Sequence, residues 1–346
     1  MDAEALARRL EAIPRVPLVN EPTPLEYLPR FSAAIGRPIY LKRDDHIGPA
    51  MGGNKARKLE YLLADALRWG HHRVVTYGGL QSNHARITAA AARRLGLEPH
   101  LFYFAPRPSR LTGNLLVNDL LGAHMHFLPF GGGTRPRSLA WTDFLVHLLA
   151  WVRVGRHYFI PVGGRSVLGG LGYVRAALEL HRQAQAEGLE NAWVVMAVGT
   201  GGMLAGLWAG FTLLRSPLRL LGIDIGALWK NFPTTVARLA ERICARLGEP
   251  HRFSATEVPL IERTYAGPSY GVPSPEGNET LRRLARMEGI LLDPIYTAKA
   301  FAGMLKQIEK GQLGKGEPVI FLHSGGLPAL FAFEEQAQDS ALGEPG

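Results

Sequence analysis

Apolar and polar residues follow two periodicities along the chain, and these predict strands and helices in alternation. Short runs rich in apolar and β-branched residues, bounded by glycine or polar residues, are typical of strands in a buried parallel sheet. We expect strands at 39–42, 73–77, 101–104, 124–128, 158–161, 193–198, 218–223 and 319–322. Between them we expect helices at 1–12, 55–67, 83–95, 114–121, 138–152 and 172–186, and another after residue 202.

The helix expected at 55–67 is amphipathic. Its apolar residues recur at intervals of three and four and therefore share one face; they are Leu59, Leu62, Leu63, Ala66 and Leu67. Asn54 stands where an N-cap residue is preferred. Lys55 lies off the apolar face, so we expect it to point into a cleft.

This alternation of strands and helices indicates the fold class. Strands that alternate with helices form parallel sheets covered by helices. A chain of 346 residues is long enough for two cores. We therefore predict an α/β protein with two open, twisted, mostly parallel sheets flanked by helices, and a cleft between them.

Two glycine-rich turns, each leading into a helix, carry the candidate chemistry. Residues 52–60 read Gly-Gly-Asn-Lys-Ala-Arg-Lys-Leu-Glu, and residues 77–86 read Tyr-Gly-Gly-Leu-Gln-Ser-Asn-His-Ala-Arg. The positive end of the helix dipole, together with Arg57 and Lys58, is expected to lower the pKa of Lys55. A lysine with a lowered pKa suits Schiff-base chemistry.

Both motifs resemble those of the D-cysteine desulfhydrase and 1-aminocyclopropane-1-carboxylate (ACC) deaminase family. These are pyridoxal-phosphate (PLP) enzymes of the tryptophan-synthase-β-like fold, or fold type II. The resemblance runs from about Pro24 to about Phe333. It implies PLP as cofactor, a small amino acid as substrate and a homodimer. It also implies a larger PLP-binding domain of residues 1–55 and 166–346, a smaller domain of residues 56–165, and an active site between them.

PLP requires partners for its aldehyde, phosphate, phenolic oxygen and ring nitrogen. The strand–turn–helix at 199–204 places backbone N–H groups around one anion, which suits the phosphate. The resemblance implies Lys55 for the aldehyde, Asn83 for the phenolic oxygen and Thr297 for the ring nitrogen. The expected cofactor-binding residues are Lys55, Lys58, Asn83, Gly199, Thr200, Gly201, Gly202, Met203, Leu204, Thr297 and Ser324.

Substrate-facing residues come from the second motif and from two tyrosines. The helix start at 81–84 forms a nest suited to a carboxylate, although Ser82 and Asn83 are also ordinary cap residues. The expected substrate-binding residues are Gln81, Ser82, Asn83, His84, Tyr270 and Tyr296. The resemblance assigns catalysis to Lys55, Ser82, Tyr270 and Tyr296.

Three positions depart from the ACC deaminase pattern. Thr297 replaces a glutamate, Ser324 a leucine and His84 a glutamine. A hydroxyl beside the ring nitrogen gives a weaker electron sink than a carboxylate, and this suffices when a good leaving group departs from Cβ. We therefore predict a PLP-dependent carbon–sulfur lyase that converts D-cysteine to pyruvate, sulfide and ammonia. ACC deamination, elimination from another three-carbon amino acid such as cysteate, and non-catalytic binding of PLP or an amino acid are the alternatives.

Composition narrows the other function classes. The net charge is +9, but the basic residues are scattered and no nucleic-acid-binding motif accompanies them. No apolar run is long enough to span a membrane, and the first residues are acidic, so we expect a cytoplasmic protein without nucleic-acid or membrane partners. The single cysteine, Cys244, precludes a cysteine cluster. His124 and His126 share one strand face without a third ligand nearby in sequence, so no metal is expected.

Overall fold

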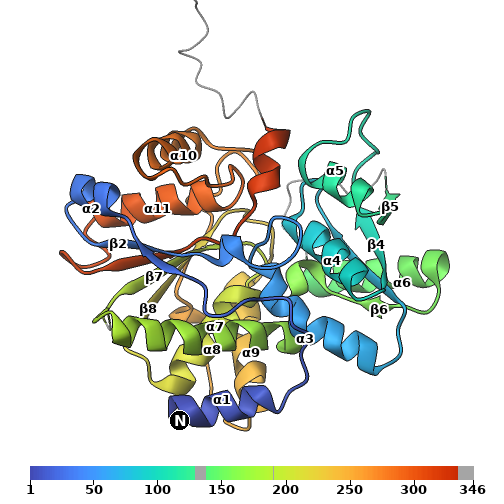
Figure 1. Cartoon of the computed structure of the whole chain (residues 1–346), viewed down its shortest axis with the longest axis horizontal. Coiled ribbons are helices and arrows are strands. Elements are labelled where there is room, and N and C mark those ends of the chain that lie inside the picture. Colours follow the sequence, from blue (N-terminus) through green and yellow to red (C-terminus); the bar gives the residue numbers. More distant parts are fainter. Residues whose placement is uncertain (129–137, 190, 334–346) are drawn as a thin grey trace, which may run out of the picture.

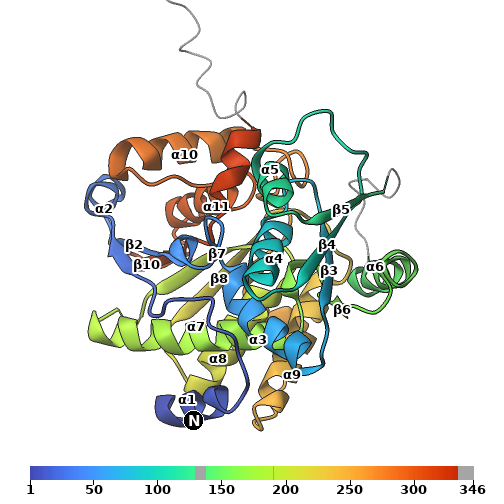
Figure 2. The same ribbon diagram turned by 45° about the vertical axis from the view of Figure 1, so that its right-hand side comes forward.

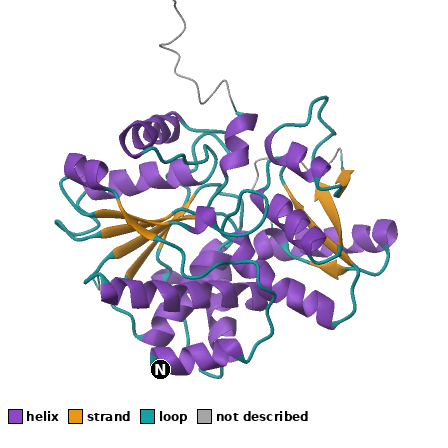
Figure 3. Ribbon diagram, in the orientation of Figure 1, coloured by secondary structure: helices purple, strands orange, loops and turns teal. Residues whose placement is uncertain are grey.

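The computed structural model describes residues 1–128, 138–189 and 191–333 (Figure 1). Within them, helices cover both faces of two separate sheets, as the colouring by secondary structure shows (Figure 3). The fold class predicted from the sequence is therefore confirmed.

Among the described residues, the larger sheet has six strands in the order β1-β2-β10-β7-β8-β9, and only β1 and β2 run antiparallel to each other. Strand β10, the last in sequence, lies between β2 and β7. The segments after β2 and β10 are thereby brought together beside the candidate site. The bounds are β1 Leu25–Tyr27, β2 Ile39–Lys42, β7 Trp193–Val198, β8 Arg219–Asp224, β9 Leu260–Ile261 and β10 Val319–Leu322.

Helices cover both faces of this sheet. In Figure 1 one group lies above it: α2 (Pro29–Ile35), α10 (Pro275–Glu288) and α11 (Thr297–Glu309). The other group lies below: α1 (Ala3–Glu11), α7 (Val167–Ala186), α8 (Gly202–Leu214) and α9 (Phe232–Arg246). Successive residues of β7 alternate between the two cores, since Val194 packs with the lower group and Val195 with the upper one. This explains why the strand is apolar throughout.

The smaller sheet is parallel throughout, in the order β5-β4-β3-β6. Its strands are β3 (Arg73–Gly78), β4 (Glu98–Tyr103), β5 (His124–Phe127) and β6 (Tyr158–Phe159). One face packs against α3 (Lys55–Arg68), α4 (Asn83–Arg94) and α5 (Gly113–Leu120), and the other against α6 (Leu139–Val154), as Figure 2 shows from the side.

The predicted elements agree best with the structure where apolar runs are continuous. Strands β2, β7 and β10 have the expected bounds. Strand β4 begins three residues before the expected Leu101, because the segment Glu98–His100 pairs with β3, and His100 also pairs with β5. Strands β1 and β9 were not expected, since each is too short to show a period. Helices α2, α10 and α11 were also missed.

Helix α7 begins at Val167, five residues before the predicted start. Its first turns contain glycines, which lower helix propensity and obscured the pattern. The glycines permit close packing: a Cβ on Gly172 would lie 2.2 Å from the carbonyl oxygen of Arg57 in α3, and one on Gly206 of α8 would lie 2.6 Å from that of Gly170. The three helices therefore approach one another almost backbone to backbone.

Helix α3 is buried on more than its apolar face. Leu59 and Leu63 of the predicted apolar face are buried, whereas Leu67, at the end of the same face, is 40% exposed. Leu59 packs into the core of the smaller sheet, whereas the backbone of Arg57 touches α7 of the larger one. Because α3 contacts both parts, the division of the chain into 1–55 with 166–346 and 56–165 stays a prediction; residues 129–137, 190 and 334–346 lie outside the described residues.

Candidate active site

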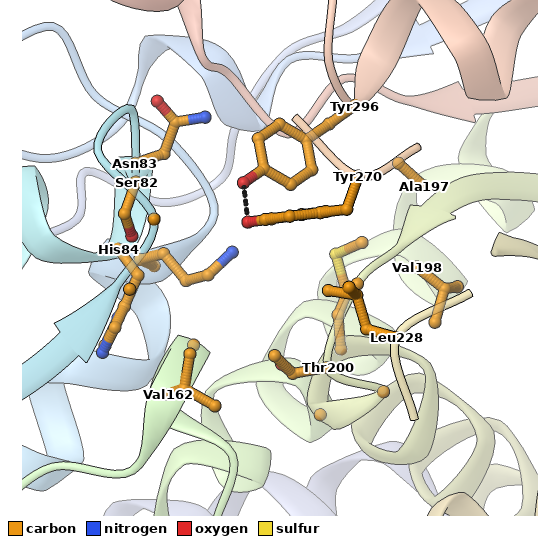
Figure 4. Close-up of a pocket in the computed structure, with 18 of the residues that line it drawn as sticks. Ser82, Asn83, His84, Val162, Ala197, Val198, Thr200, Leu228, Tyr270 and Tyr296 are labelled. Carbon is orange, nitrogen blue, oxygen red and sulfur yellow. Dashed lines mark hydrogen bonds between the residues drawn. The ribbon is translucent and has the colours of Figure 1, made fainter. Parts of the chain in front are cut away.

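A cavity of about 380 Å³ lies between the two sheets, within the usual range for small-molecule sites. Its walls include the segments that follow β3 and β7 and the first residues of α3, α4 and α8. Figure 4 shows Ser82, Asn83 and His84 on one side, with Tyr270 and Tyr296 across from them. Ligands of open α/β sheets bind at such carboxyl ends of strands.

The loop before α3 is fixed by contacts from distant segments. The backbone N–H of Asn54 donates to the carbonyl of Ser324, at 3.0 Å. Buried Arg86 of α4 donates to the carbonyl of Ala50 and, at 3.0 Å, to that of Gly52. The arginine of the second motif therefore binds the glycine turn of the first, a link that the sequence does not reveal.

Lys55 lies against the cavity, and its Nζ donates to Oδ1 of Asn54 at 2.8 Å. Burial lowers the pKa of Lys55 to about 8; the Asp293 carboxylate opposes this change and the Arg86 cation adds to it. The predicted direction is confirmed, but burial, not the expected neighbouring charges, is the main cause.

The expected contribution of Arg57 to this pKa was wrong. The Arg57 side chain points away from the cavity and pairs with Asp44 at 2.8 Å and Glu179 at 2.9 Å. Because these carboxylates neutralise its charge, Arg57 does not contribute to the lowered pKa of Lys55. Helix α3 thus presents a lysine to the cavity and a buried ion-pair network to its other side.

Lys58 lies beside the start of α8. Its Nζ donates to the carbonyl of Gly163 at 2.9 Å, and a Cβ built on Gly202 would lie 3.0 Å from the same atom. Burial, followed by the charges of Lys55 and Arg165, lowers the pKa of Lys58 well below its ordinary value. The N-cap of α8, Gly201, has a φ of 77° and offers no side chain to the first-turn N–H groups. A buried amine and uncapped N–H groups make this corner suitable for an anion.

The start of α4 carries Ser82 and His84. Ser82 Oγ accepts from the backbone N–H of Ala85 at 3.2 Å, the usual N-cap contact. His84 Nε2 lies 2.7 Å from Oγ1 of Thr76, whose hydroxyl donates to Ile160. The Thr76 oxygen therefore accepts the Nε2 proton of His84. Burial, then the charges of Lys55 and Lys58, lowers the pKa of His84 well below its usual value, so the ring is neutral.

Asn83 is oriented by Asn114 of α5, a residue that sequence analysis missed. The Asn114 amide donates to Oδ1 of Asn83 at 2.9 Å and to the carbonyl of Gln81 at 3.0 Å. Its own Oδ1 accepts from Arg86 at 2.6 Å. Because the Asn83 oxygen is occupied, its amide N–H groups are the ones free for a ligand. Gln81 itself binds α5, at 2.8 Å from the backbone N–H of Asn114.

Tyr270 and Tyr296 meet on the opposite wall. Their hydroxyls are 2.6 Å apart and their rings are nearly perpendicular, as Figure 4 shows. Burial is the main cause that raises the pKa of Tyr270 and, more strongly, that of Tyr296. Both phenols are therefore protonated at neutral pH, and one of the two hydroxyl protons is free for a ligand.

Asp293, which sequence analysis missed, binds the backbone N–H groups that lead into α11 with its buried carboxylate. Oδ2 accepts from the backbone N–H groups of Ile295 and Tyr296, at 3.0 and 2.9 Å. Oδ1 accepts from the hydroxyl of Thr297 at 2.7 Å. The same carboxylate opposes the loss of charge on Lys55, so it acts electrostatically on the cavity without bordering on it.

Of the residues expected in the site, all but Gln81 and Thr297 border on the cavity. Gln81 turns toward α5 and Thr297 is fully buried against Asp293. The cavity wall also includes Tyr77, which the second motif contains but to which no role was assigned, and residues that no motif indicated, among them Phe104, Val162, Leu228 and Trp229. They come from strand ends and loops, where side chains show no periodic signal.

Comparison with known proteins places this geometry in a family. Residues 16–325 match the family described as pyridoxal-phosphate dependent enzyme. The chain belongs to that family. Its cofactor is therefore PLP, as the sequence predicted.

Two relatives are similar over nearly the whole chain. The D-cysteine desulfhydrase of Salmonella choleraesuis (strain SC-B67) is 41% identical over 336 residues, covering 94% of this chain and 97% of its own. The structure of an ACC deaminase homologue has 35% identity and a TM-score of 0.86, over 96% of this chain and 98% of that one. Threonine deaminase isoform 2 of Solanum lycopersicum (17% identity, TM-score 0.63, 94% and 85% coverage) shows the shared fold.

The residues present fit PLP chemically. A neutralisable lysine borders on the cavity at Lys55, and the free amide N–H groups of Asn83 suit an anionic oxygen. The start of α8 leaves its N–H groups uncapped beside Lys58, as a phosphate requires. A larger residue at Gly202 would crowd the Lys58 amine, so the cradle depends on that glycine.

Among the described residues, no helix is long and apolar enough to cross a membrane. Cys244 is buried in α9, and its burial raises the pKa of the thiol to about 12.

Proposed function

We propose that this enzyme eliminates sulfide from D-cysteine, giving pyruvate, hydrogen sulfide and ammonia with uptake of one water. The observation that carries the proposal is the pairing of a lysine of lowered pKa, Lys55, with a protonated phenol pair across one cavity. Similarity to a D-cysteine desulfhydrase at 41% identity supports the choice of substrate.

Lys55 is proposed as the group that binds the PLP aldehyde and takes the Cα proton. When bound, PLP supplies an electron sink for the negative charge at Cα. A pKa of about 8 leaves part of the Lys55 amine uncharged at neutral pH, which is the form that accepts a proton. Asn54 holds Nζ from the side, so the amine is oriented before substrate arrives.

The remaining proposed roles follow from the two walls. The backbone turn around Ser82 and His84 receives the substrate carboxylate, with the Asn83 amide beside it. Tyr270 or Tyr296 donates a proton to sulfur as the Cβ–S bond breaks, since their shared hydroxyl pair leaves one proton free. Ser82 stays a proposed catalytic residue; its cap contact with Ala85 leaves the hydroxyl proton available.

For PLP we propose Lys58, Ser324 and the turn at 199–204 as further binding residues, with Thr297 at the ring nitrogen. The Thr297 proton is committed to the Asp293 carboxylate at 2.7 Å, and its oxygen accepts from the backbone N–H of Asp293 at 2.8 Å, so the hydroxyl offers a ligand only its remaining lone pair. A lone pair accepts a hydrogen bond from a protonated ring nitrogen. The Asp293–Thr297 pair therefore weakens the distinction between a threonine and a carboxylate at this position.

Comparing substrates tests the proposal. Purified PLP-loaded protein is incubated separately with D-cysteine, L-cysteine, cysteate and ACC, and sulfide, sulfite, pyruvate, ammonia and 2-oxobutyrate are measured. We expect sulfide with equal pyruvate from D-cysteine, at least ten times faster than product from the other three. Faster release of 2-oxobutyrate from ACC would establish the second candidate, which the similarity to an ACC deaminase homologue favours. Turnover of none of them would favour a binding protein.

A homodimer is also proposed, and the outer face of α6 supports it. Six large apolar side chains recur there at helical spacing and are 38–81% exposed: Trp141, Phe144, Leu145, Leu148, Trp151 and Val152. A contiguous exposed apolar stripe is typical of an interaction surface. Leu148→Glu is expected to shift the sedimentation coefficient from that of a dimer to that of a monomer. Leu120→Glu, at an exposed position at the end of α5, is the control and should leave the coefficient unchanged. A cytoplasmic location stays a prediction that cell fractionation would test.

A further inference from the structure

Strands β4 and β5 bring four metal-binding side chains to one face of the smaller sheet. Glu98 and His100 are two residues apart in β4, and His124 and His126 are two apart in β5, so each pair shares a face. His100 lies directly opposite His124 in the parallel register. The sequence showed only the pair in β5; the third and fourth candidates come from pairing with a strand some 24 residues away in the chain.

His100 is the central residue of this cluster and is 9% exposed. Its Nδ1 lies 3.2 Å from Nε2 of His126. Its Nε2 is buried without a hydrogen-bond partner among the described residues, and Oε2 of Glu98 is 3.9 Å away. When His100 donates its Nδ1 proton to His126, Nε2 keeps a lone pair. A buried lone pair beside a carboxylate, with no donor, is an unfavourable arrangement that a cation would resolve.

We propose that Glu98, His100 and His124 form a binding site for a divalent transition-metal ion, with Zn²⁺ the best match. One ligand atom from each residue lies within 4.8 Å of those of the other two. Two imidazoles and a carboxylate suit zinc and its neighbours in the transition series, not magnesium or calcium. His126 is a positioning residue, since a metal-binding histidine usually donates its other N–H to a fixed acceptor.

Binding requires a small local movement. In a tetrahedral zinc site with bonds of about 2.0–2.1 Å, ligand atoms are about 3.3 Å apart, so the present spacing of at most 4.8 Å must close by no more than about 1.5 Å. The rings of His100 and His124 stack at 4.5 Å, and His124 must turn out of this stack. His124 is exposed, and the Glu98 side chain is about half exposed, so neither is held by surrounding core packing. Arg73 occupies Oε2 of Glu98 at 3.0 Å, which leaves the other carboxylate oxygen for the ion.

The site would join the edge strand β5 to β4, since its ligands come from both. It lies apart from the PLP cavity, none of whose lining residues belongs to it. Failure of the proposed lyase activity would therefore leave this inference untouched, and the reverse also holds.

Zn²⁺ titration of untagged, PLP-loaded protein by calorimetry tests the site, with Co²⁺ as a spectroscopic probe. We expect one ion per chain, a ligand-field spectrum typical of nitrogen and oxygen ligands, and a melting temperature that rises with Zn²⁺. A hundredfold excess over the dissociation constant would add about 2.7 kcal/mol to the free energy of unfolding.

Variants locate the ion. His124→Ala and Glu98→Gln change side chains outside the core, so both variants are expected to fold. The absorbance of bound PLP checks that they do. Each is expected to weaken Zn²⁺ binding at least tenfold and to abolish the rise in melting temperature; His126→Phe should weaken it about 10–100-fold. His251→Ala, an exposed histidine elsewhere, is the matched control. Unchanged affinity in both ligand variants, or no stoichiometric binding by the unaltered chain, would overturn the proposal.

Discussion

The starts of α3 and α4 look alike in sequence but are stabilised differently. Each follows a glycine turn, borders on the same cavity and has a preferred cap residue. In α4, Ser82 adopts an extended backbone and accepts from the N–H of Ala85. In α3, Asn54 is already helical, and its side chain contacts Lys55 and Met203 instead of capping.

This difference shows that one helix start is stabilised by local contacts and the other by contacts from distant segments. The start of α4 is stabilised by its own residues. The start of α3 is held by the Ser324 carbonyl and by Arg86 from α4, which leaves Asn54 free to orient the lysine. A residue type favoured at caps therefore does not establish that a cap forms.

The largest effect is expected when the reacting side chain at the start of α3 is removed. Lys55→Ala should lower D-cysteine turnover by at least about a thousandfold and abolish the absorbance of lysine-bound PLP, because no other proposed group does both tasks. Activity assays and an absorption spectrum check this. Ser82→Ala is the counterpart in α4 and should keep the spectrum. Retention of both spectrum and turnover in Lys55→Ala would place the chemistry elsewhere.

A second variant removes the support that α4 gives to α3. Arg86→Met leaves the carbonyls of Ala50 and Gly52 without their donors, and should lower the free energy of unfolding by about 2–4 kcal/mol. Urea unfolding of the apoprotein measures it. Arg93→Met is the control, because Arg93 also donates to two carbonyls from α4 but is exposed, and a loss below about 1 kcal/mol is expected. Equal losses of stability in the two variants would mean that the hydrogen bonds from Arg86 to the loop before α3 have no special role.

Alanine substitutions at the two cap positions test the contrast directly. Ser82→Ala should cost about 1 kcal/mol of apoprotein stability, since a true cap contact is lost. Asn54→Ala should cost less than half of that but slow PLP capture, since Nζ of Lys55 loses its acceptor. Urea unfolding measures the stability of both variants, and the rate of absorbance change on adding PLP measures how fast each captures the cofactor. A larger stability loss at Asn54 would reverse the comparison.

The smallest expected effect is a shift along the pH axis. The neutral form of Lys55 attacks the PLP aldehyde, so the capture rate should rise with pH and reach half its maximum near the lysine pKa of about 8. The Asp293 carboxylate favours the charged form, so Asp293→Asn should lower that pKa and move the midpoint to lower pH. Asp224→Asn, another buried carboxylate, is the control and should leave it in place. A shift to higher pH would contradict the assigned sign.

Periodicity and apolar runs in the sequence predicted the fold better than they predicted the contacts within the site. Strands β7 and β10 could be bounded from sequence because they are continuous apolar runs in which every residue except Trp193 is buried. The start of α7 could not, because its glycines serve a neighbouring helix. The two motifs, the turn at 199–204 and the residues implied by the resemblance together indicated most of the cavity wall, yet Asn114 and Asp293 went without a role. Their importance depends on hydrogen bonds between segments that are distant in sequence, and no local pattern records those.

The glycine at position 172 limits how the sequence around the lysine can change. It faces the backbone of Arg57, two residues beyond Lys55, at a separation that excludes even a methyl group. A substitution at this position would therefore displace the backbone that carries the Lys55 amine, although the glycine itself takes no part in the reaction. In a library that randomises α7, position 172 should tolerate fewer replacements than the charged surface positions of the same helix, so that the active site constrains the evolution of a residue that never touches substrate.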